Sequence, residues 1–552
     1  MSDPVGPDPV GPDSIDGGGA SEAPTRGALV RSSAVVAVGT LLSRVTGLLR
    51  VVALLYALDL TRFSDAYNAA NTMPNLVYEL LLGGILSATL VPVFVDARDR
   101  GDDDATSAVV STAGIALVIV TVVGVMVAPS LVSVITSQVD DPAEAAAQQE
   151  VAAFLLRLFM PQVLFYGLIT VVTALLHSRR SYAAPAFTPI LNNLIVSAML
   201  FSLPALVAWD IDGPNAIFRA DDETGLLLVL GLGTTAGVAV MGLALLPSLA
   251  RQRVRLRFRP DWRHPAVRTV VRLSGWTVGY VVSNQIALYV VLALANGSGE
   301  GELSAYQAAF IFFQLPHGLV AVSVMTTFLP ELTEAARTGD HVAYRARFAL
   351  GLRLIAVAVL PAAAGYVALS TEIVDLLPLG SASVELTADV LAAFAVGLLP
   401  FSVYLFALRG FYARQDTRTP FVVNVFENGV NIALAFPLVA VAGVAGLAGA
   451  YSAAYAVGAV VAVWALSRRV GGLPRREVLD PMGRMLVAAV ACGGSAWLVA
   501  RAGADLAVEL RVVAAAAVGG VAYVGVALVL RVDEITTLRG MVESRLLPSR
   551  RR

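Results

Sequence analysis

The sequence predicts an all-α protein that crosses a membrane about fourteen times, and two observations support this fold class. Hydrophobic residues make up 57% of the 552 residues and charged residues 14%, whereas a soluble domain carries about 25% charged residues. Apolar stretches of about 20 residues, the length that crosses about 30 Å of hydrocarbon, recur along the chain. A soluble chain could not keep this much apolar surface away from water, so we expect a polytopic membrane protein.

Each expected span is an apolar stretch that ends at a short polar join. The spans lie at 30–57, 65–95, 107–136, 151–177, 184–209, 224–250, 269–295, 304–333, 346–370, 385–409, 418–443, 445–467, 482–501 and 506–531. We expect the chain to divide into a disordered acidic tail rich in Pro and Gly at 1–28, a first lobe of six helices at 29–250, a basic cytoplasmic linker at 251–268, a second lobe of six helices at 269–470, two further helices within 480–532, and a basic cytoplasmic tail at 533–552.

Two stretches, 160–193 and 399–428, repeat the same order of features, and they predict the two lobes. Each has a proline within a span, then aromatic residues, a basic turn, a second proline and an asparagine at the same distance from that proline. The matching pairs are Pro185 with Asn193 and Pro420 with Asn428. Two such halves, arranged like pseudo-symmetric repeats around a central cavity, commonly work by alternating access.

The charges of the joins predict the orientation, since cytoplasmic loops of membrane proteins are rich in Arg and Lys. Alternate joins carry Arg98 and Arg100, Arg179 and Arg180, the stretch 251–264, Arg337 and Arg345, Arg414 and Arg418, and the stretch 467–477. The other joins, among them 138–150, 210–223 and 297–304, are acidic or neutral. We therefore expect both termini to be cytoplasmic. The run "RQRVRLRFR" is also compatible with a nucleic-acid patch or an edge strand, but between two spans the orienting role is favoured, and no nucleic-acid partner is expected.

Two arginines in the first span are the first sign of a function. Arg44 and Arg50 lie within apolar sequence, although a cation at the middle of a bilayer costs about 2.5–3.5 kcal/mol. On a helix they are about 9 Å apart along the axis. Gly47 lies between them and leaves room for a ligand to approach.

The second span carries a polar stripe at helical spacing that cannot face lipid. Its members are Asp65, Asn68, Asn71, Thr72, Asn75 and Glu79. One explanation is helix-to-helix hydrogen bonding, which contributes about 0.6 kcal/mol per bond. The favoured explanation is the wall of a hydrated cavity, with Glu79 as counter-charge to one arginine and Pro74 as a hinge or kink.

Further polar groups lie at membrane depth in the second lobe and are candidate cavity residues. They are Asn284, Gln285, Gln314 and Asn428. His317 is expected to be a packing histidine with a satisfied ring rather than a proton relay.

Missing motifs narrow the function further. The sequence contains no phosphate-binding loop of the GxxxxGK[ST] type, no HExxH and no GxSxG, which argues against an ATPase, a zinc protease or a serine hydrolase. The single cysteine, Cys492, excludes an intramolecular disulfide. We expect no cofactor, no metal and no enzymatic activity, although an enzyme that uses intramembrane carboxylates stays open. The general prediction is a transporter for a substrate with an anionic group.

Two stretches resemble the MviN/MurJ lipid II flippases of bacteria, "GTLLSRVTGLLR" (39–50) and "DAYNAANTMPNLVYELLLGGILSATLVPVF" (65–94). Their residues are most similar to those of the actinobacterial branch. Further similar stretches are "PAFTPILNN" (185–193), "QLPHGLVAVSVMTTFLPEL" (314–332) and "FYARQDTRTP" (411–420). The resemblance implies the MOP transporter fold, with two six-helix lobes and two final helices associated with a lipid-tail groove. It also implies a location in the bacterial plasma (inner) membrane.

The implied substrate is lipid II, undecaprenyl diphosphate that carries the disaccharide–pentapeptide, moved from the cytoplasmic to the outer leaflet. The resemblance places the headgroup-binding arginines of the family at Arg44 and Arg50 and its acidic residue at Asp65. The chain departs from the family where many members have a basic residue, just after "PNL" and within "AFIFFQLP" (309–316). Implied partners are lipid II, membrane lipids and proteins of cell-wall synthesis or division.

Two alternatives remain from the sequence. The chain could be another exporter of the MOP fold, for a different polyprenyl-linked oligosaccharide or, in exchange for an ion, for a drug. It could also be a scaffold for cell-wall proteins. A cation exporter should carry acidic residues in place of the paired arginines.

Overall fold

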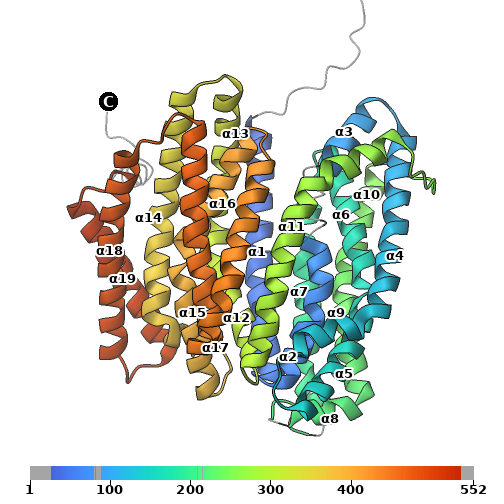
Figure 1. Ribbon diagram of the computed structural model, residues 1–552, viewed down its shortest axis with the longest axis horizontal. Coiled ribbons are helices and arrows are strands. Elements are labelled where there is room, and N and C mark those ends of the chain that lie inside the picture. The colour runs from blue at the N-terminus through green and yellow to red at the C-terminus, as the bar shows by residue number, and fades with distance from the viewer. Residues whose placement is uncertain (1–25, 80, 82–88, 208, 214, 536–552) are drawn as a thin grey trace, which may run out of the picture.

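The computed structural model describes residues 26–79, 81, 89–207, 209–213 and 215–535, and in these residues the regular structure is helical, without strands. The helices run side by side in two groups that face each other (Figure 1). The predicted tails at 1–28 and 533–552 lie almost entirely outside the described residues, and the division of the chain at the stated limits stays a prediction.

The first group of helices contains α1 to α10. Their bounds are α1 Arg26–Leu58, α2 Arg62–Glu79, α3 Val91–Asp99, α4 Asp103–Thr136, α5 Pro142–Phe159, α6 Gln162–Ser178, α7 Ala183–Leu206, α8 Ala216–Asp222, α9 Thr224–Leu243 and α10 Leu246–Arg251. Within this lobe α7 packs against α1 and α9, while α5 packs against α2, α4 and α9.

The second group contains α11 to α17, followed by two helices at the edge. Their bounds are α11 Pro265–Ser298, α12 Glu302–Pro316, the π-helical turn η2 His317–Ala321, α13 Val322–Arg337, α14 His341–Val374, α15 Ser381–Val396, α16 Leu398–Ala413, α17 Arg418–Arg469, α18 Arg475–Ala502 and α19 Val508–Val529. α17 packs against α11, α15 and α16, and the pair α18 and α19 packs against α14. Figure 1 shows this pair at the outer edge of the second lobe.

Helices occupy all fourteen predicted spans, within the described residues. Eleven helices are long and apolar enough to cross a membrane, or twelve if α15 and α16, which meet at 46°, form one span. The 52 residues of α17 would be about 78 Å long as one helix, far more than a bilayer needs. Ala442 and Gly443 have non-helical backbone angles, so α17 contains two spans. α2 is not among these candidate spans, since its polar stripe keeps its hydropathy low.

The turns at the ends of α6 and α16, which lie in the two repeated stretches, have the same backbone conformation. Non-glycine residues with positive φ end α6 and α16, Arg180 with φ 58° and Gln415 with φ 59°. Each turn closes with the same backbone hydrogen bond, from Ser181 N to Leu176 O at 2.9 Å and from Asp416 N to Phe411 O at 3.0 Å. The same bond closes the turns after α3, α13, α17 and α19, so it is a common helix ending, and the repeat of the two lobes stays a prediction.

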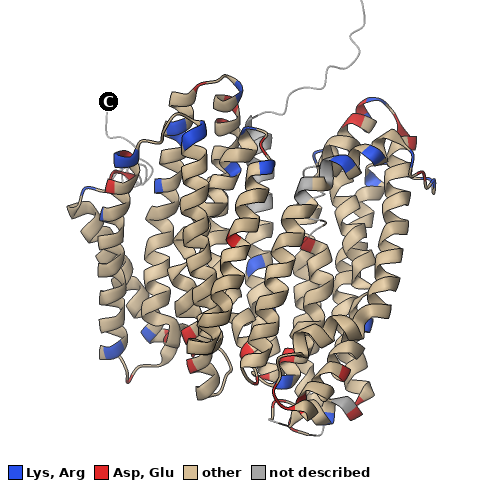
Figure 2. Cartoon of the chain, in the orientation of Figure 1, with Lys and Arg blue, Asp and Glu red and all other residues tan. Residues whose placement is uncertain are grey.

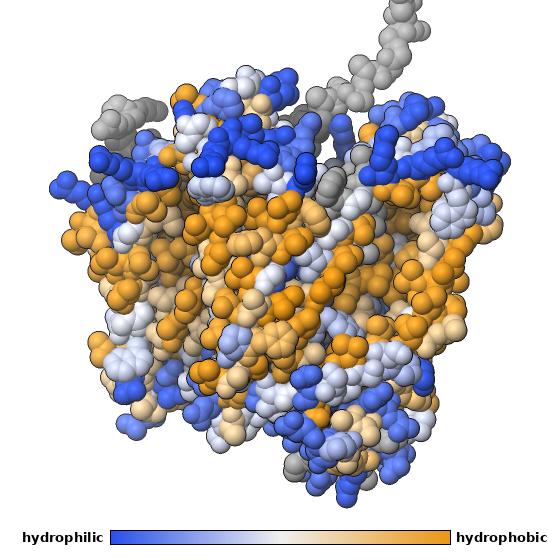
Figure 3. Space-filling view, viewed as in Figure 1, coloured by the Kyte–Doolittle hydropathy of each residue, from blue (hydrophilic) through white to orange (hydrophobic). Residues whose placement is uncertain are grey.

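The two ends of the helix bundle differ in charge. Basic residues gather at the upper end in Figure 2, and acidic residues are prominent at the lower end. Contacts between joins confirm that the basic joins meet at one end, since Arg345 donates to Gly471 O at 3.0 Å and Arg469 pairs with Asp416. Figure 3 shows a broad apolar belt between two hydrophilic caps, with hydrophilic surface recessed where the lobes meet.

Candidate substrate-binding cavity

Two neighbouring cavities lie between the lobes, and they share Asn75, Gln307, Ile311 and Gln314 in their walls. The first, of about 620 Å³, is the arginine compartment, because Arg44 and Arg50 line it. The second, of about 840 Å³, is the aromatic compartment. Together they place a cavity beside the polar stripe of α2, where the sequence predicts one.

The arginine compartment is formed by α1, α2, α7 and α12. Arg44 and Arg50 are half-buried, and within the described part of the chain neither guanidinium has a hydrogen-bond or ion-pair partner among the residues around it. An unpaired cation would be costly in contact with acyl chains, but it is solvated in a polar cavity. The two arginines are therefore available to an anionic ligand.

Glycines determine the space around these arginines. A Cβ on Gly47 would lie 3.6 Å from Asn193 Nδ2, an ordinary contact, so the cavity has room beside α1. Gly318, in η2 of the second lobe, is different, because its Cβ would lie 2.8 Å from Arg44 Cζ. Arg44 thus reaches from the first lobe to the second, and a side chain at 318 would require the guanidinium to shift.

Five of the six stripe residues on α2 line the cavities, and two predictions made for the stripe, the pairing of Glu79 and the position of Asp65, are exceptions. Asn68 and Asn71 line the arginine compartment, and Asn75 lines both. Asn75 accepts a hydrogen bond from Tyr166 of α6 at 2.9 Å, which fixes its amide. Pro74 is buried, and α2 remains helical across it to its last residue, so a hinge at Pro74 stays a prediction.

Glu79 is the first exception. It lines the aromatic compartment, and no ion pair joins it to Arg44 or Arg50 among the contacts of the described residues. The expected counter-charge is therefore wrong in this conformation. The reason is position, since Glu79 lines only the aromatic compartment, whereas both arginines line the arginine compartment.

The aromatic compartment belongs mainly to the second lobe. All four candidate residues predicted there, Asn284, Gln285, Gln314 and Asn428, line it. Asn428 donates to Asn284 Oδ1 at 2.9 Å, which links α17 to α11. Aromatic side chains complete the wall, and they are Tyr280, Tyr306, Phe310, Phe401, Tyr412, Tyr451 and Tyr455. Rings and amides together suit a sugar or peptide group, which presents flat apolar faces and hydrogen-bonding edges.

Arg409 is a cavity residue that the sequence analysis missed. It lies on α16, is exposed, and lines the aromatic compartment together with Glu79. It has no ion-pair or hydrogen-bond partner in the part of the chain that the structure describes. Its position one turn before the basic end of α16 resembles that of a snorkelling residue, which is why the sequence alone gave no signal for it.

His317 has the packing role that was predicted. Its Nδ1 lies 2.9 Å from Ser402 Oγ, and its ring packs edge-on against Phe401 with centroids 4.6 Å apart. No group of three or more His, Cys, Asp or Glu that could hold a metal occurs within the described residues.

Asp65 is the second exception, because it lines neither cavity and is fully buried at the acidic end. Its Oδ1 accepts from Ser304 N at 2.9 Å and from Ser304 Oγ at 2.7 Å, and its Oδ2 accepts from Gly301 N at 2.8 Å. The carboxylate of the first lobe thus caps the N-terminus of α12 in the second, where a negative charge is favourable. Gly301 is required there, with φ +77° and no space for a Cβ against Leu60 O.

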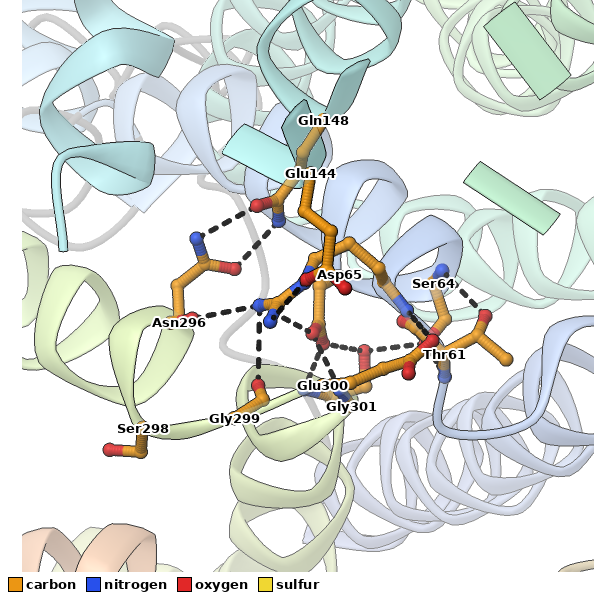
Figure 4. A network of polar contacts seen from close by, with 12 residues as sticks. Thr61, Ser64, Asp65, Glu144, Gln148, Asn296, Ser298, Gly299, Glu300 and Gly301 are labelled. Atoms are coloured by element: carbon orange, nitrogen blue, oxygen red, sulfur yellow. Dashed lines mark hydrogen bonds and ion pairs between the residues drawn. The ribbon is translucent and has the colours of Figure 1, made fainter. Parts of the chain in front are cut away.

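A second set of bonds surrounds Asp65 (Figure 4). Arg62 donates to Asn296 O at 2.9 Å and to Gly299 O at 3.2 Å, and pairs with Glu144 at 3.2 Å. The amides of Gln148 and Asn296 bond reciprocally, at 2.7 and 3.1 Å. We call Arg62, Asp65, Glu144, Gln148 and their partners at 296–304 the outer lock, since they tie the two lobes at the end opposite the arginine-rich joins.

Comparison with known proteins places the chain among lipid transporters. A family model described as "Lipid II flippase MurJ" matches residues 55–512. The chain is 28% identical over 407 residues to "Lipid II flippase MurJ" of Burkholderia cenocepacia. This match covers 71% of this chain and 75% of the relative. The chain is 26% identical over 526 residues to "Probable lipid II flippase MurJ" of Bdellovibrio bacteriovorus, which covers 93% and 96%.

Solved structures agree on the fold. A lipid II flippase MurJ in an inward closed conformation superposes with a TM-score of 0.73 at 20% identity, over 91% of this chain and 99% of the other. An inward-facing multidrug resistance transporter of the MATE family and MOP superfamily gives a TM-score of 0.63 at 12% identity, over 77% and 94%. The predicted MOP fold is therefore confirmed.

Proposed function

The chain belongs to the lipid II flippase MurJ family, and on this premise we propose that it moves lipid II from the cytoplasmic to the outer leaflet. It is a multi-pass protein of the inner membrane. The observation that carries the proposal is the pair of arginines, Arg44 and Arg50, which line a cavity between the two lobes and have no ion-pair partner among the described residues. A diphosphate offers several anionic oxygens, which match two guanidinium groups about 9 Å apart along a helix.

We assign the two compartments to different parts of the headgroup. The diphosphate binds in the arginine compartment, while the sugar and peptide occupy the aromatic compartment, where Arg409 supplies a third cation. Arg409 would thus compensate for two basic residues that this chain lacks and that many family members have, one after "PNL" and one in the eighth span. The polyprenyl tail stays in lipid, and no covalent chemistry is required.

The basic joins support an orientation in which both termini are cytoplasmic. The outer lock then lies on the external side, and the structure represents a state closed to the outside. We propose that diphosphate binding neutralises Arg44 and Arg50, that the lobes close over the headgroup at the cytoplasmic end, and that the outer lock breaks to release it. Moving such an equilibrium from 1:99 to 99:1 requires about 5.5 kcal/mol of differential binding.

The test is transport of labelled lipid II by the purified protein in vesicles. The wild type should move lipid II, and Arg44→Ala should abolish transport while the protein stays folded. The matched control is Arg157→Ala, an exposed arginine on α5 that lines neither cavity. A wild type that moves cationic drugs and not lipid II would overturn the proposal in favour of a drug exporter. A scaffold would move neither, and its Arg44→Ala variant would still rescue a depleted strain.

A further inference from the structure

The basic linker between the lobes carries charges that this transport cycle does not use. Residues 251–263, which we call the basic strap, contain six arginines and one aspartate. All six arginines are exposed. Among the described residues only Arg259 of these six forms an ion pair, with Asp104 of α4. Five exposed cations without counter-charges indicate a surface that meets an anionic partner.

The backbone of the strap is fixed to α4. The N–H groups of alternate residues donate to α4 hydroxyls, from Arg257 to Ser107 at 3.1 Å, from Arg259 to Ser111 at 2.9 Å and from Asp261 to Thr112 at 3.3 Å. Since every second N–H faces the helix, the backbone is extended there, and successive side chains point to opposite sides. The strap is therefore a ribbon with two distinct faces.

The sequence places different chemistry on these two faces. Over the extended residues 254–261 the arginines occupy odd positions, 255, 257 and 259, whereas Leu256 and Phe258 occupy even ones. Arg259 turns toward Asp104, in the first turn of α4 at the basic end of the molecule. Leu256 and Phe258 consequently point to the side opposite the arginines, and Trp262 follows them in the turn that leads to α11. They are large and solvent-exposed, Phe258 at 80%, Trp262 at 56% and Leu256 at 41%.

The depth of the ribbon matches the membrane surface. Its anchor points, Ser107 to Thr112, extend over about 7.5 Å of α4 and lie within about 14 Å of the first residue of that helix. In Figure 1 the chain between α10 and α11 passes the upper end of α4, and in Figure 3 the hydrophilic cap meets the apolar belt at that level. Tryptophan is enriched at this boundary in membrane proteins.

We propose that the basic strap binds anionic phospholipid headgroups of the cytoplasmic leaflet, with its arginines on the phosphates and Leu256, Phe258 and Trp262 inserted beside the acyl chains. The proposal uses the orientation given above but not the identity of the transported lipid. A nucleic acid would also attract the arginines, but it would leave three large apolar side chains in water. The strap joins the lobes, so its lipid contacts would hold the first lobe at a fixed depth while the second moves.

The first experiment measures binding of phosphatidylglycerol and phosphatidylcholine to the full-length protein in detergent by native mass spectrometry. The wild type should prefer phosphatidylglycerol, and Arg255→Gln with Arg257→Gln should weaken this binding about tenfold or more. The matched control is Arg475→Gln with Arg476→Gln, which removes the same charge from an exposed join at the same end, and it should change binding less than twofold. Equal losses in both variants, or no preference in the wild type, would overturn the proposal.

A second measurement separates insertion from simple charge attraction. A spin label at Phe258→Cys, in a Cys492→Ala background, should be accessible to oxygen and protected from a water-soluble relaxation agent in vesicles that contain phosphatidylglycerol. A label that is fully accessible to the water-soluble agent would contradict the proposed ribbon. Binding of an RNA oligonucleotide that depends on Arg255 and Arg257 and that phosphatidylglycerol does not displace would assign the strap to nucleic acid instead.

Discussion

Arg62 and Arg44 are two arginines of neighbouring helices with opposite surroundings. Arg62 is 5% exposed and has acceptors from three residues of the outer lock, the oxygens of Asn296 and Gly299 and the carboxylate of Glu144. Arg44 is half-buried, faces a cavity of about 620 Å³ and has no such partner among the described residues. The comparison shows that the contacts of a buried or half-buried arginine indicate its role. The paired Arg62 holds the lobes together, whereas Arg44, without a partner among the described residues, is available to a ligand.

The largest expected effect comes from removing both unpaired cations. Arg44→Gln with Arg50→Gln should lower lipid II transport more than a hundredfold, because each charge-assisted hydrogen bond to the diphosphate contributes about 1.5–3 kcal/mol. The melting temperature should stay within about 2 °C, since no protein partner is lost. A transport assay in vesicles checks the predicted loss of activity, and thermal unfolding of the same preparation checks the predicted melting temperature. A large fall in melting temperature would show that the two arginines are structural.

Breaking the outer lock should have the opposite signature. Asp65→Asn turns an acceptor-only carboxylate into an amide, which cannot accept from both Gly301 and Ser304 without presenting a donor to one of them. We expect a loss of about 2–4 kcal/mol from the externally closed state. Spin labels at Asp140→Cys and Ser381→Cys, in a Cys492→Ala background, should report a longer distance across the outer end.

The control for that measurement is Asp59→Asn, which alters a local bond to Leu60 N only and should leave the distance distribution unchanged. If Asp65→Asn leaves the distribution unchanged as well, the outer lock does not hold the lobes together.

A smaller loss of transport is expected from a substitution at Gly318, the residue of the second lobe that Arg44 approaches. Gly318→Ala should displace the Arg44 guanidinium, because the new Cβ would lie 2.8 Å from Cζ, and it should reduce transport about tenfold by misplacing the cation. Gly365→Ala is the matched control, a helical glycine of the same lobe with nothing within 4 Å of its Cβ position. Equal rates for the two alanine variants would mean that the Arg44 position is not critical.

The smallest predicted effect concerns Arg409. Arg409→Gln should raise the KM for lipid II about threefold to tenfold and leave kcat nearly unchanged, because an exposed cation at the mouth contributes to capture more than to the moving step. Kinetics at several salt concentrations give the check, since the difference from the wild type should shrink as salt screens the charge. A salt-independent loss of kcat would place Arg409 in the transport step instead.

The sequence was sufficient for features that depend on local pattern. Hydropathy located the long apolar helices, eleven or twelve of which are candidate membrane spans in the described residues, and helical spacing placed Arg44, Gly47 and Arg50 along the wall of one cavity. The repeated Pro and Asn spacing predicted that the two lobes are related, and this stays a prediction, although the turns at Arg180 and Gln415 are alike.

Features that depend on contact between distant segments could not be predicted. The hydrogen-bond donors to Asp65, Gly301 and Ser304, are more than 230 residues away in the chain. Its place in the stripe therefore predicted a cavity residue, whereas its hydrogen bonds belong to the outer lock. For the same reason the sequence predicted a pairing of Glu79 with an arginine that the structure does not show. It also gave no sign that Gly318 lies next to Arg44. Which helix faces which across the lobes is a property of tertiary packing, and local periodicity does not contain it.

The most direct measurement of the central claim is the affinity of the purified protein for lipid II before and after the two unpaired arginines are neutralised. The account predicts that Arg44→Gln with Arg50→Gln weakens binding about a hundredfold or more, while a variant with Arg157→Gln binds as the wild type does. Wild-type affinity in the folded double variant would contradict the claim that these two guanidinium groups bind the diphosphate.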